Sequence, residues 1–433
     1  MISNDRFDRE LVAALGDLAP LRSPDYLSDI LGRTARTRQR PAWASLERLL
    51  PMDIATKVAG AMTFPWRRLA LIAVLGLLLA VATAIYSGSQ REFPAAPPFG
   101  LAGNGLVAYE TNGDIFVSDP VTGAVSPITS GADAERQPIW SPNGTRLAYT
   151  ASSSDGVRVV VVRPDGSGKT IVTPEPLRSV DRVVFSPDGS QLVIAAGRDV
   201  STALALASVA GDRFEWLETN GPAIFPVFRP PDGAELLFAG GSVDAGGMAL
   251  YALDLASRQI TQIAAPRKGG QFTGSPQYSP DGTRIAYTYW ISGTPDVGVV
   301  LYEERESRVH IVDAEGATEP VRIPVPDGLC CDGFPAWSND GTRLAFVRWY
   351  DVPADKGIAI VPVEIGGAGR WYPVPSLDTV RLTWSPDDRF LLVTPLDSSD
   401  IRLPQVRLDV ETGAIVDIPW ETTSDPAWQR LAP

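Results

Sequence analysis

Histidine and cysteine are almost absent from the chain. It holds one histidine, His310, and two cysteines, which are adjacent at Cys330 and Cys331. Because a structural zinc site draws four ligands from His and Cys at characteristic spacings, this scarcity excludes an ordinary His/Cys zinc site. His310 alternates with its neighbours in residues 307–312 as a strand residue does, so we expect a structural role for it. The sequence predicts no cofactor and no metal, and leaves an all-carboxylate site open.

The chain also lacks the motif of one large class of hydrolases. No Gly-x-Ser-x-Gly sequence occurs in its 433 residues, and this motif carries the nucleophile of the α/β-hydrolase fold. The carboxylate pairs used in glycoside chemistry can come from any loop of a binding face, and the sequence does not locate such a pair. We therefore expect a protein without catalytic activity, with a hydrolase or lyase as an alternative.

Positive charge is scarce outside the N-terminal part. Residues 1–68 hold eleven Lys or Arg and eight Asp or Glu, a net charge of +3, whereas the whole chain has a net charge of −13. Residues 69–433 therefore carry a net charge of −16. Such an acidic region repels polyanions, which argues against nucleic acid or anionic lipid as its ligand.

One β-hairpin motif, by contrast, occurs six times in the chain. Each copy reads as a strand that ends in an aromatic residue, a turn, and a second strand with alternating apolar residues; the copies are PIWSPNGTRLAY, VVFSPDGSQLVI, PVFRPPDGAELLF, PQYSPDGTRIAY, PAWSNDGTRLAF and LTWSPDDRFLLV. In the turn, Pro presets φ, Asp or Asn hydrogen-bonds the nearby backbone, and Gly accepts a positive φ. Asp388 stands where Gly is expected, and Asp tolerates that conformation. The third copy has one extra residue in 228–233 and should bulge.

The spacing of the copies predicts a β-propeller. The aromatic residues recur every 43 to 59 residues, at Trp140, Phe185, Phe228, Tyr278, Trp337 and Trp384. This period is that of four-stranded blades, and we expect the aromatics to pack between blades. Residues 106–129 supply three strands without a first one, and residues 425–428 supply a first strand without followers. Pairing these ends closes an all-β propeller, with seven blades expected and six or eight as alternatives.

Residues 104–433 resemble a known family. The motif Pro-x-[Trp/Phe/Tyr]-Ser-Pro-Asp-Gly-Thr-Arg-[Leu/Ile]-Ala-[Tyr/Phe] is similar to that of the TolB-type, WD-repeat-like β-propellers. The resemblance implies the propeller fold. The family role of TolB is protein–protein contact in the bacterial cell envelope, and similar propellers gate prolyl-oligopeptidase-type peptidases. The chain departs from both, because the segment before its propeller is unlike the α/β domain of TolB and it has no hydrolase motif.

An apolar segment precedes the repeats. Residues 69–86 contain no charged residue, and eighteen helical residues rise about 27 Å, enough to cross the core of a bilayer with its flanks. We expect a single transmembrane helix, because a cleaved signal peptide would need a positively charged region of 68 residues. Eight of the eleven basic residues before this segment lie between positions 33 and 68, whereas one follows it closely, which predicts a cytoplasmic N-terminus; they are Arg33, Arg36, Arg38, Arg40, Arg48, Lys57, Arg67 and Arg68 before it and Arg91 after it.

These features divide the chain into four parts. We predict a short helical cytoplasmic segment (1–66), a transmembrane helix (67–88), a Pro/Gly/Ser linker (89–103) and an extracytoplasmic propeller (104–433). The expected function is binding of a protein or another ligand of the cell envelope. By architecture alone the chain resembles bacterial transmembrane anti-sigma factors, so a signalling protein that holds a cytoplasmic regulator on residues 1–65 is an alternative. Residues 1–68 lack the His and Cys of zinc-containing anti-sigma domains.

The candidate binding residues lie where long loops interrupt the repeat. In a propeller, the loops between second and third strands share a face with those that lead into each first strand, opposite the Ser-Pro-Asp-Gly turns. Large aromatics beside Arg in exposed loops are typical of binding sites. We therefore predict a binding site of Trp290, Trp349 and Tyr350, with Arg348, Cys330 and Cys331 as neighbours. Burial of the aromatics against the blades, as loop anchors, is the alternative.

The adjacent cysteines admit two states. Neighbouring Cα atoms lie about 3.8 Å apart, short of the usual disulfide range, so a bridge between Cys330 and Cys331 would be strained. An oxidising location outside the membrane permits one. We expect two reduced, half-buried thiols, with a vicinal disulfide as the alternative.

Overall fold

A computed structural model describes most of the repeat region. The described residues are 98–199, 201–241, 248–265, 270–291, 306–324, 329–350, 356–364, 369–374, 379–396, 405–418, 420 and 425–432. The chain divides into two compact units, Met1–Arg91 and Glu92–Pro433, and every described residue belongs to the second. The predicted cytoplasmic helices and the apolar segment 69–86 lie outside the described residues. Among the described residues, no helix has the length and apolar character needed to cross a membrane.

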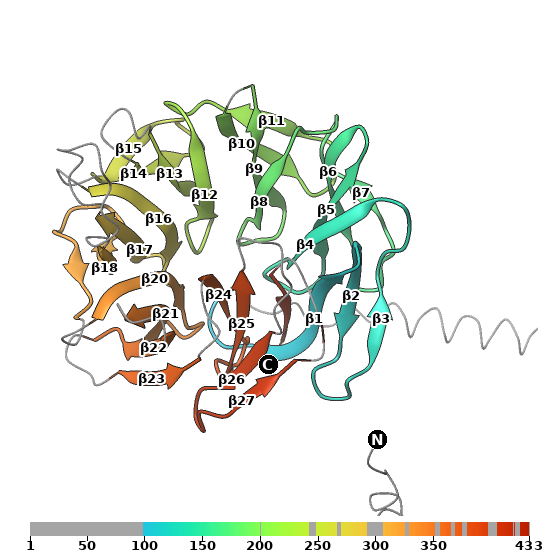
Figure 1. The fold of residues 1–433 in the computed structure, drawn as a ribbon. Coiled ribbons are helices and arrows are strands. Elements are labelled where there is room, and N and C mark those ends of the chain that lie inside the picture. The colour runs from blue at the N-terminus through green and yellow to red at the C-terminus, as the bar shows by residue number, and fades with distance from the viewer. Residues whose placement is uncertain are drawn as a thin grey trace, which may run out of the picture. The chain divides into compact units, whose positions relative to one another are not determined.

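The second unit is a β-propeller whose sheets stand around a central axis (Figure 1). Five sheets have four strands each. Their strands are β28 (Ala427–Leu431), β1 (Gly103–Thr111), β2 (Asp114–Ser118) and β3 (Val125–Pro127); β4 (Ala134–Trp140), β5 (Leu147–Ser153), β6 (Gly156–Val162) and β7 (Thr170–Ile171); β8 (Val180–Phe185), β9 (Gln191–Arg198), β10 (Ser201–Ser208) and β11 (Phe214–Leu217); β12 (Ala223–Phe228), β13 (Glu235–Gly240), β14 (Ala249–Asp254) and β15 (Ile260–Ala264); and β24 (Thr379–Trp384), β25 (Phe390–Leu396), β26 (Val406–Asp409) and β27 (Ile415–Asp417).

A sixth sheet has eight strands. These are β16 (Gly270–Tyr278), β17 (Arg284–Ile291), β18 (Glu306–Asp313), β19 (Val321–Arg322), β20 (Leu329–Trp337), β21 (Arg343–Tyr350), β22 (Lys356–Pro362) and β23 (Arg370–Pro373). The expectation of seven separate blades was therefore wrong: five blades stand as separate four-stranded sheets, and two repeat units are merged. The cause is a parallel bridge between Ser307 of β18 and Cys331 of β20, which joins the two units edge to edge.

The two ends of the repeat region close the ring as predicted. β28 pairs antiparallel with β1, with Trp428 opposite Val107 and Ala427 opposite Ala108. A sheet of one C-terminal and three N-terminal strands results, in the order β28-β1-β2-β3. The C-terminal strand thus supplies the first strand of the sheet that the three N-terminal strands form, which closes the ring.

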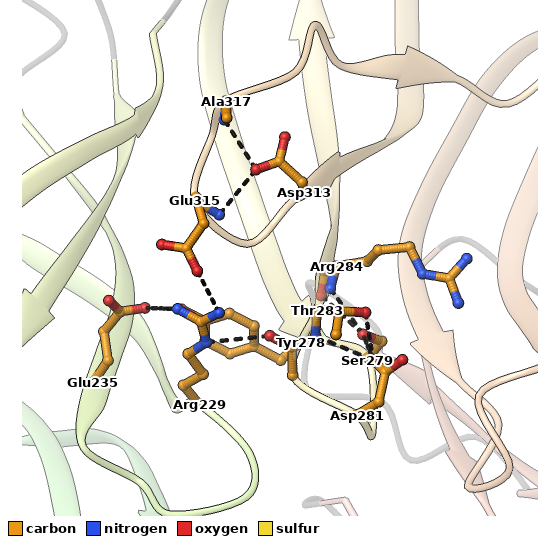
Figure 2. A network of polar contacts seen from close by, with 11 residues as sticks. Arg229, Glu235, Tyr278, Ser279, Asp281, Thr283, Arg284, Asp313, Glu315 and Ala317 are labelled. Carbon is orange, nitrogen blue, oxygen red and sulfur yellow. Dashed lines mark hydrogen bonds and ion pairs between the residues drawn. The ribbon is translucent and has the colours of Figure 1, made fainter.

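The repeated turns follow the chemistry of their residues. In the turn between β16 and β17, Ser279 N donates to Arg284 O at 2.8 Å and Gly282 N donates to Ser279 O at 2.8 Å. Asp281 Oδ1 accepts a hydrogen bond from Thr283 N at 3.1 Å. Gly282 has a φ of +69°, which explains why Gly occupies this position. Figure 2 shows these contacts beside the neighbouring sheet.

The two irregular copies behave as their sequences predict. Asp388 takes the Gly position of the last copy and has a φ of +58°. In the third copy Gly233 N donates to Arg229 O at 2.9 Å, across four residues, whereas Gly282 N reaches back only three residues to Ser279. The extra residue therefore widens the turn without breaking the hairpin.

The repeat aromatics connect neighbouring units, as predicted. Trp337 Nε1 donates to Gln277 O of β16 at 3.3 Å, and Trp384 Nε1 donates to Ala336 O of β20 at 3.0 Å. The Arg of the repeat motif adds a second contact, because the Arg343 guanidinium carbon lies 5.0 Å from the ring centroid of Trp384. Each indole thus bonds to the first strand of the preceding repeat unit.

Where the repeat aromatic is tyrosine, a polar network connects the neighbouring repeat units (Figure 2). Tyr278 of β16 donates its hydroxyl to Glu235 Oε1 of β13 at 2.5 Å, and burial raises the Tyr278 pKa. Arg229, which follows β12, donates from Nη2 to Glu315 Oε1, beyond β18, at 2.6 Å. The apolar core is likewise shared between sheets, since buried Leu237 packs in one cluster with residues of both β13 and β17.

Candidate functional site

The strand ends predicted to carry the binding residues lie side by side. Trp290 of β17 is opposite Ser307 of β18, Ser307 is bridged to Cys331 of β20, and Cys331 is opposite Trp349 of β21. We call this lateral row of four backbone positions the strand junction. The bridge that merges the two repeat units therefore runs through the region where the sequence places a site.

A buried ion pair lies next to this row. Arg348 Nε donates to Asp332 Oδ1 at 2.7 Å and Nη2 donates to Asp332 Oδ2 at 3.0 Å, a bidentate pair. Asp332 has no exposed surface and Arg348 is 7% exposed. Nη2 also donates to Pro324 O at 3.3 Å, and the guanidinium carbon lies 5.1 Å from the ring centroid of Phe346. These contacts fix the ends of β20 and β21 relative to each other.

The charge around Asp332 is locally positive. Burial raises the pKa of its carboxyl group, while the hydrogen bonds and charge of Arg348 and the charges of Arg308 and Arg322 oppose that rise. Arg308 is 6% exposed, and its Nη1 donates to Ser307 O at 2.9 Å. One carboxylate therefore faces three guanidinium groups within a unit that is acidic overall.

The expectation of reduced thiols was wrong. Cys331 is disulfide-bonded and 5% exposed, and Cys330 is the only other cysteine of the chain. The sequence showed only that a bridge between adjacent residues would be strained. It did not show that Cys331 lies in a strand with a paired strand on each side, β18 and β21, which hold its backbone in register.

The structure corrects the setting of the other predicted residues. Arg348 is a buried strand residue paired with Asp332, not an exposed loop residue. Trp290, Trp349 and Tyr350 also lie within strands, because β17 extends to Ile291 and β21 to Tyr350. Their backbones are brought together at the strand junction, while their side chains and that of Cys330 lie outside the described residues. Ligand binding by them stays a prediction.

Sequence reasoning missed three residues of this region. Asp332, Arg308 and Ser307 are all at least 94% buried and polar or charged. Ser307 Oγ has no hydrogen-bond partner among the described residues. A signal existed for Asp332, because an acidic residue directly after two cysteines at the start of a repeat strand is unlike every other copy of the motif.

His310 takes the structural place expected for it. It lies in β18 opposite Tyr287, with its ring 5.7 Å from the Tyr287 ring in a stacked arrangement and 5.5 Å from that of Tyr289 in an edge contact. Its Nδ1 lies 3.4 Å from Arg308 O. In the described part of the chain, no group of three or more His, Cys, Asp or Glu side chains is arranged to hold a metal ion.

Comparison with known proteins gives short sequence matches and a broad structural likeness. The chain is 29% identical over 110 residues to the Tol-Pal system protein TolB of Gluconobacter oxydans (strain 621H), which covers 24% of each protein. It is 30% identical over 119 residues to the peptidase YuxL of Bacillus subtilis (strain 168), which covers 28% of the chain and 16% of that protein. The matches thus span a quarter or less of either curated relative. No family model matches the chain.

Solved structures extend the likeness to the whole propeller. An oligogalacturonate lyase in complex with manganese aligns with a TM-score of 0.53 and 15% identity, covering 73% of this chain and 85% of the lyase. A puromycin-hydrolyzing peptidase of Mycobacterium tuberculosis aligns with a TM-score of 0.52 and 14% identity, covering 76% of this chain and 57% of the peptidase. At these identities the likeness establishes a shared fold. The repeat region therefore has the β-propeller fold of these proteins, and part of it is similar in sequence to TolB.

Proposed function

We propose that the chain is a membrane-anchored, extracytoplasmic propeller that binds a protein or another ligand of the cell envelope at the strand junction and carries out no chemistry. The observation that supports this site is the register of four strand positions, Trp290, Ser307, Cys331 and Trp349, where two repeat units merge within the described part of the chain. Rigidly held strand ends that carry aromatics are suited to binding, because little conformational freedom is lost on association.

The chemistry of the described residues favours binding over catalysis at this place. Both oxygens of Asp332 accept hydrogen bonds from Arg348, so the carboxylate is not placed to act as a general base. His310 stacks against Tyr287 on the neighbouring strand. The match to a Tol-Pal system protein supports a role in the cell envelope, and the uncharged segment 69–86 supports a membrane anchor.

Site-specific photocrosslinking in the full-length chain tests the site. Trp349→p-benzoylphenylalanine and Trp290→p-benzoylphenylalanine should each give the same discrete crosslinked species in cells. Val416→p-benzoylphenylalanine is the matched control, because Val416 is 49% exposed on β27, in another sheet. The proposed site would be refuted by crosslinks that form equally well from position 416, or by none from positions 290 and 349.

Fractionation tests the anchor and its orientation. The full chain should remain with membranes after a carbonate wash and its propeller should be open to protease in spheroplasts, whereas deletion of residues 69–86 should release it. Release of the unaltered chain by carbonate would contradict the anchor. Specific recovery of a cytoplasmic regulator by residues 1–65 would instead favour the signalling alternative.

An activity screen tests the non-catalytic part of the proposal. The purified chain should leave a panel of peptides and glycans, including polyuronates, unchanged with and without added Mn²⁺. Turnover that persists through repurification would show an enzyme. If Trp349→Ala and Tyr350→Ala also left that turnover intact, the active site would lie away from the strand junction.

A further inference from the structure

One residue at the same place in each repeat unit belongs to a set whose members, with one exception, line a common cavity. This residue stands three positions before the repeat aromatic, and the set, which we call the channel ring, is Gln137, Arg182, Phe225, Ser275, Phe334, Arg381 and Asp425. All of them except Gln137 line one cavity of about 300 Å³. They come from β8, β12, β16, β20 and β24 and from the residue two positions before β28, innermost strands that surround the axis in Figure 1.

A repeated backbone irregularity shapes this ring. Four of its members precede a proline and have positive φ values between 50° and 56°, namely Gln137, Phe225, Ser275 and Phe334. In each case the pairing with the second strand shifts register at this point. A bulge re-aims the side chain of its residue, and a left-handed conformation at a residue other than Gly is typically found where function requires it.

The ring has an apolar and a charged part. Phe225 and Phe334 line the cavity from β12 and β20. Arg182, Arg381 and Asp425 line it from β8, β24 and the entry to β28, so two positive charges face one negative charge. Arg381 Nη1 and Asp425 Oδ2 are paired at 2.6 Å. The net charge of these ring side chains is therefore +1.

Among the described residues, Arg182 has no hydrogen-bond or ion-pair partner. Its Nε is buried and has no hydrogen-bond acceptor, and its guanidinium forms no hydrogen bond or ion pair with any described residue. Burial lowers its pKa to about 10, the charge of Arg381 lowers it further and that of Asp425 opposes the change. Asp425 Oδ1 is likewise buried without a donor. Both side chains are only partly buried as a whole. A buried polar atom without a hydrogen-bond partner is costly, so Arg182 Nε and Asp425 Oδ1 point to a missing ligand.

We infer that the channel ring binds a small monocarboxylate with an apolar body, its carboxylate on Arg182 and its body against Phe225 and Phe334. A single negative charge balances the ring, whereas a doubly charged phosphate would leave excess negative charge beside Asp425. The free Oδ1 of Asp425 calls for a donor close to the carboxylate, which an α-hydroxy acid supplies. This site is separate from the proposed function, because no residue of the strand junction lines the cavity.

Calorimetric titration of the full-length chain with a matched ligand series tests the inference. We expect 3-phenyllactate to bind more tightly than 3-phenylpropanoate, which lacks the hydroxyl group, and 3-phenylpropanamide, which lacks the charge, to bind at least about tenfold more weakly than either. The peptide Gly-Gly-Phe separates a free acid from a chain terminus that bears the same carboxylate. Absence of binding by both carboxylates, or tighter binding of Gly-Gly-Phe, would overturn the inference of a free acid.

Variants assign the binding to the ring. Arg182→Met should weaken 3-phenyllactate binding about tenfold to a hundredfold, while the ligand-free protein melts at the same or a higher temperature because a partly buried charge without an ion-pair partner has been removed. Arg178→Met is the control, since Arg178 donates to Asp199 O at an exposed site, and it should bind normally. Unchanged affinity in Arg182→Met would contradict the site.

A second variant tests separately whether the apolar side chains of the channel ring contact the ligand. Phe225→Ala should reduce the preference for 3-phenyllactate over lactate by about tenfold and leave the binding of lactate itself unchanged. This ratio is measured within one preparation and stays informative if Arg182→Met does not fold. An unchanged preference would place the ligand elsewhere than in the channel ring.

Discussion

The closing sheet and the strand junction both join parts of the propeller, but they do so with different chemistry. The closing sheet pairs β28 with β1 in an antiparallel ladder and adds side-chain bridges, such as Gln429 Nε2 to Gly144 O at 2.7 Å. The strand junction joins β18 to β20 by one parallel bridge and surrounds it with a buried ion pair and a disulfide. The first completes the repeat, whereas the second interrupts it.

This difference separates scaffold from candidate site. A closing ladder is built from the same strand and turn positions as the other sheets, so its residues are explained by folding alone. Among the described residues, a buried bidentate ion pair such as that of Asp332 and Arg348 occurs in this unit alone, and it costs desolvation free energy that an apolar pair would avoid. Such exceptions to a repeat are where we expect function to lie.

The largest loss of stability is expected from a substitution in the buried ion pair beside the strand junction. Asp332→Ala should destabilise the propeller by about 3–5 kcal/mol, because it leaves the Arg348 guanidinium buried without its counter-charge. Denaturant unfolding of wild type and variant measures this loss.

The control is the double variant Asp332→Leu with Arg348→Met, which replaces both charges by apolar groups and should recover most of the stability. If the double variant were as unstable as the single one, packing volume rather than charge would hold this region together.

Two glycines at the same place in the repeat turn distinguish the closing sheet from the junction. Both have left-handed φ values, +70° at Gly144 and +71° at Gly341. A Cβ at Gly144 would lie 2.0 Å from Arg430 O of β28, whereas at Gly341 its nearest neighbour would be Pro280 Cδ at 3.5 Å. Gly144→Ala should therefore cost about 2–4 kcal/mol, since overpacking adds to backbone strain, and Gly341→Ala about 1 kcal/mol. Equal melting temperatures for the two variants would contradict the close packing of β28 on this turn.

The smallest effect is expected from the turn carboxylates, which occur throughout the scaffold. Burial opposes ionisation of Asp281, but hydrogen bonds from Ser279 and Thr283 outweigh it and lower the Asp281 pKa below its ordinary value of 3.8. Because the folded-state pKa is depressed, the stabilisation is present above pH 3.8 and is lost as the pH falls through the lower folded value.

Asp281→Asn should thus cost about 1 kcal/mol or less at pH 7 and nothing near pH 2. The first copy of the repeat already carries Asn143 here, whose Oδ1 accepts a hydrogen bond from Thr145 N at 3.1 Å. Unfolding free energies of wild type and variant, measured across this pH range, give the comparison. A difference that grows at low pH would reverse the sign predicted from the depressed pKa.

Much of the scaffold could be predicted from the sequence because its determinants are local. The turn at Gly282, the substitution of Gly by Asp388 and the pairing of Trp428 with Val107 all follow from residues within one hairpin or from the count of strands. The merger of two units was not predictable, because the bridge from Ser307 to Cys331 pairs strands of different repeats. The partner of Arg348 was missed for another reason: Asp332 lies sixteen residues away in the same hairpin, but Arg348 was expected in an exposed loop rather than in β21 opposite Asp332.

By itself the sequence determined the repeat, its turn chemistry and the closure of the ring. These depend on interactions within a hairpin, which recur wherever the motif recurs. Only the tertiary structure decided that two units share a sheet, that Cys331 is oxidised and buried beside an ion pair, and that Arg182 lines the channel unpaired. These outcomes depend on which side chains meet across units and how far water is removed from them, and a linear pattern encodes neither distance nor burial.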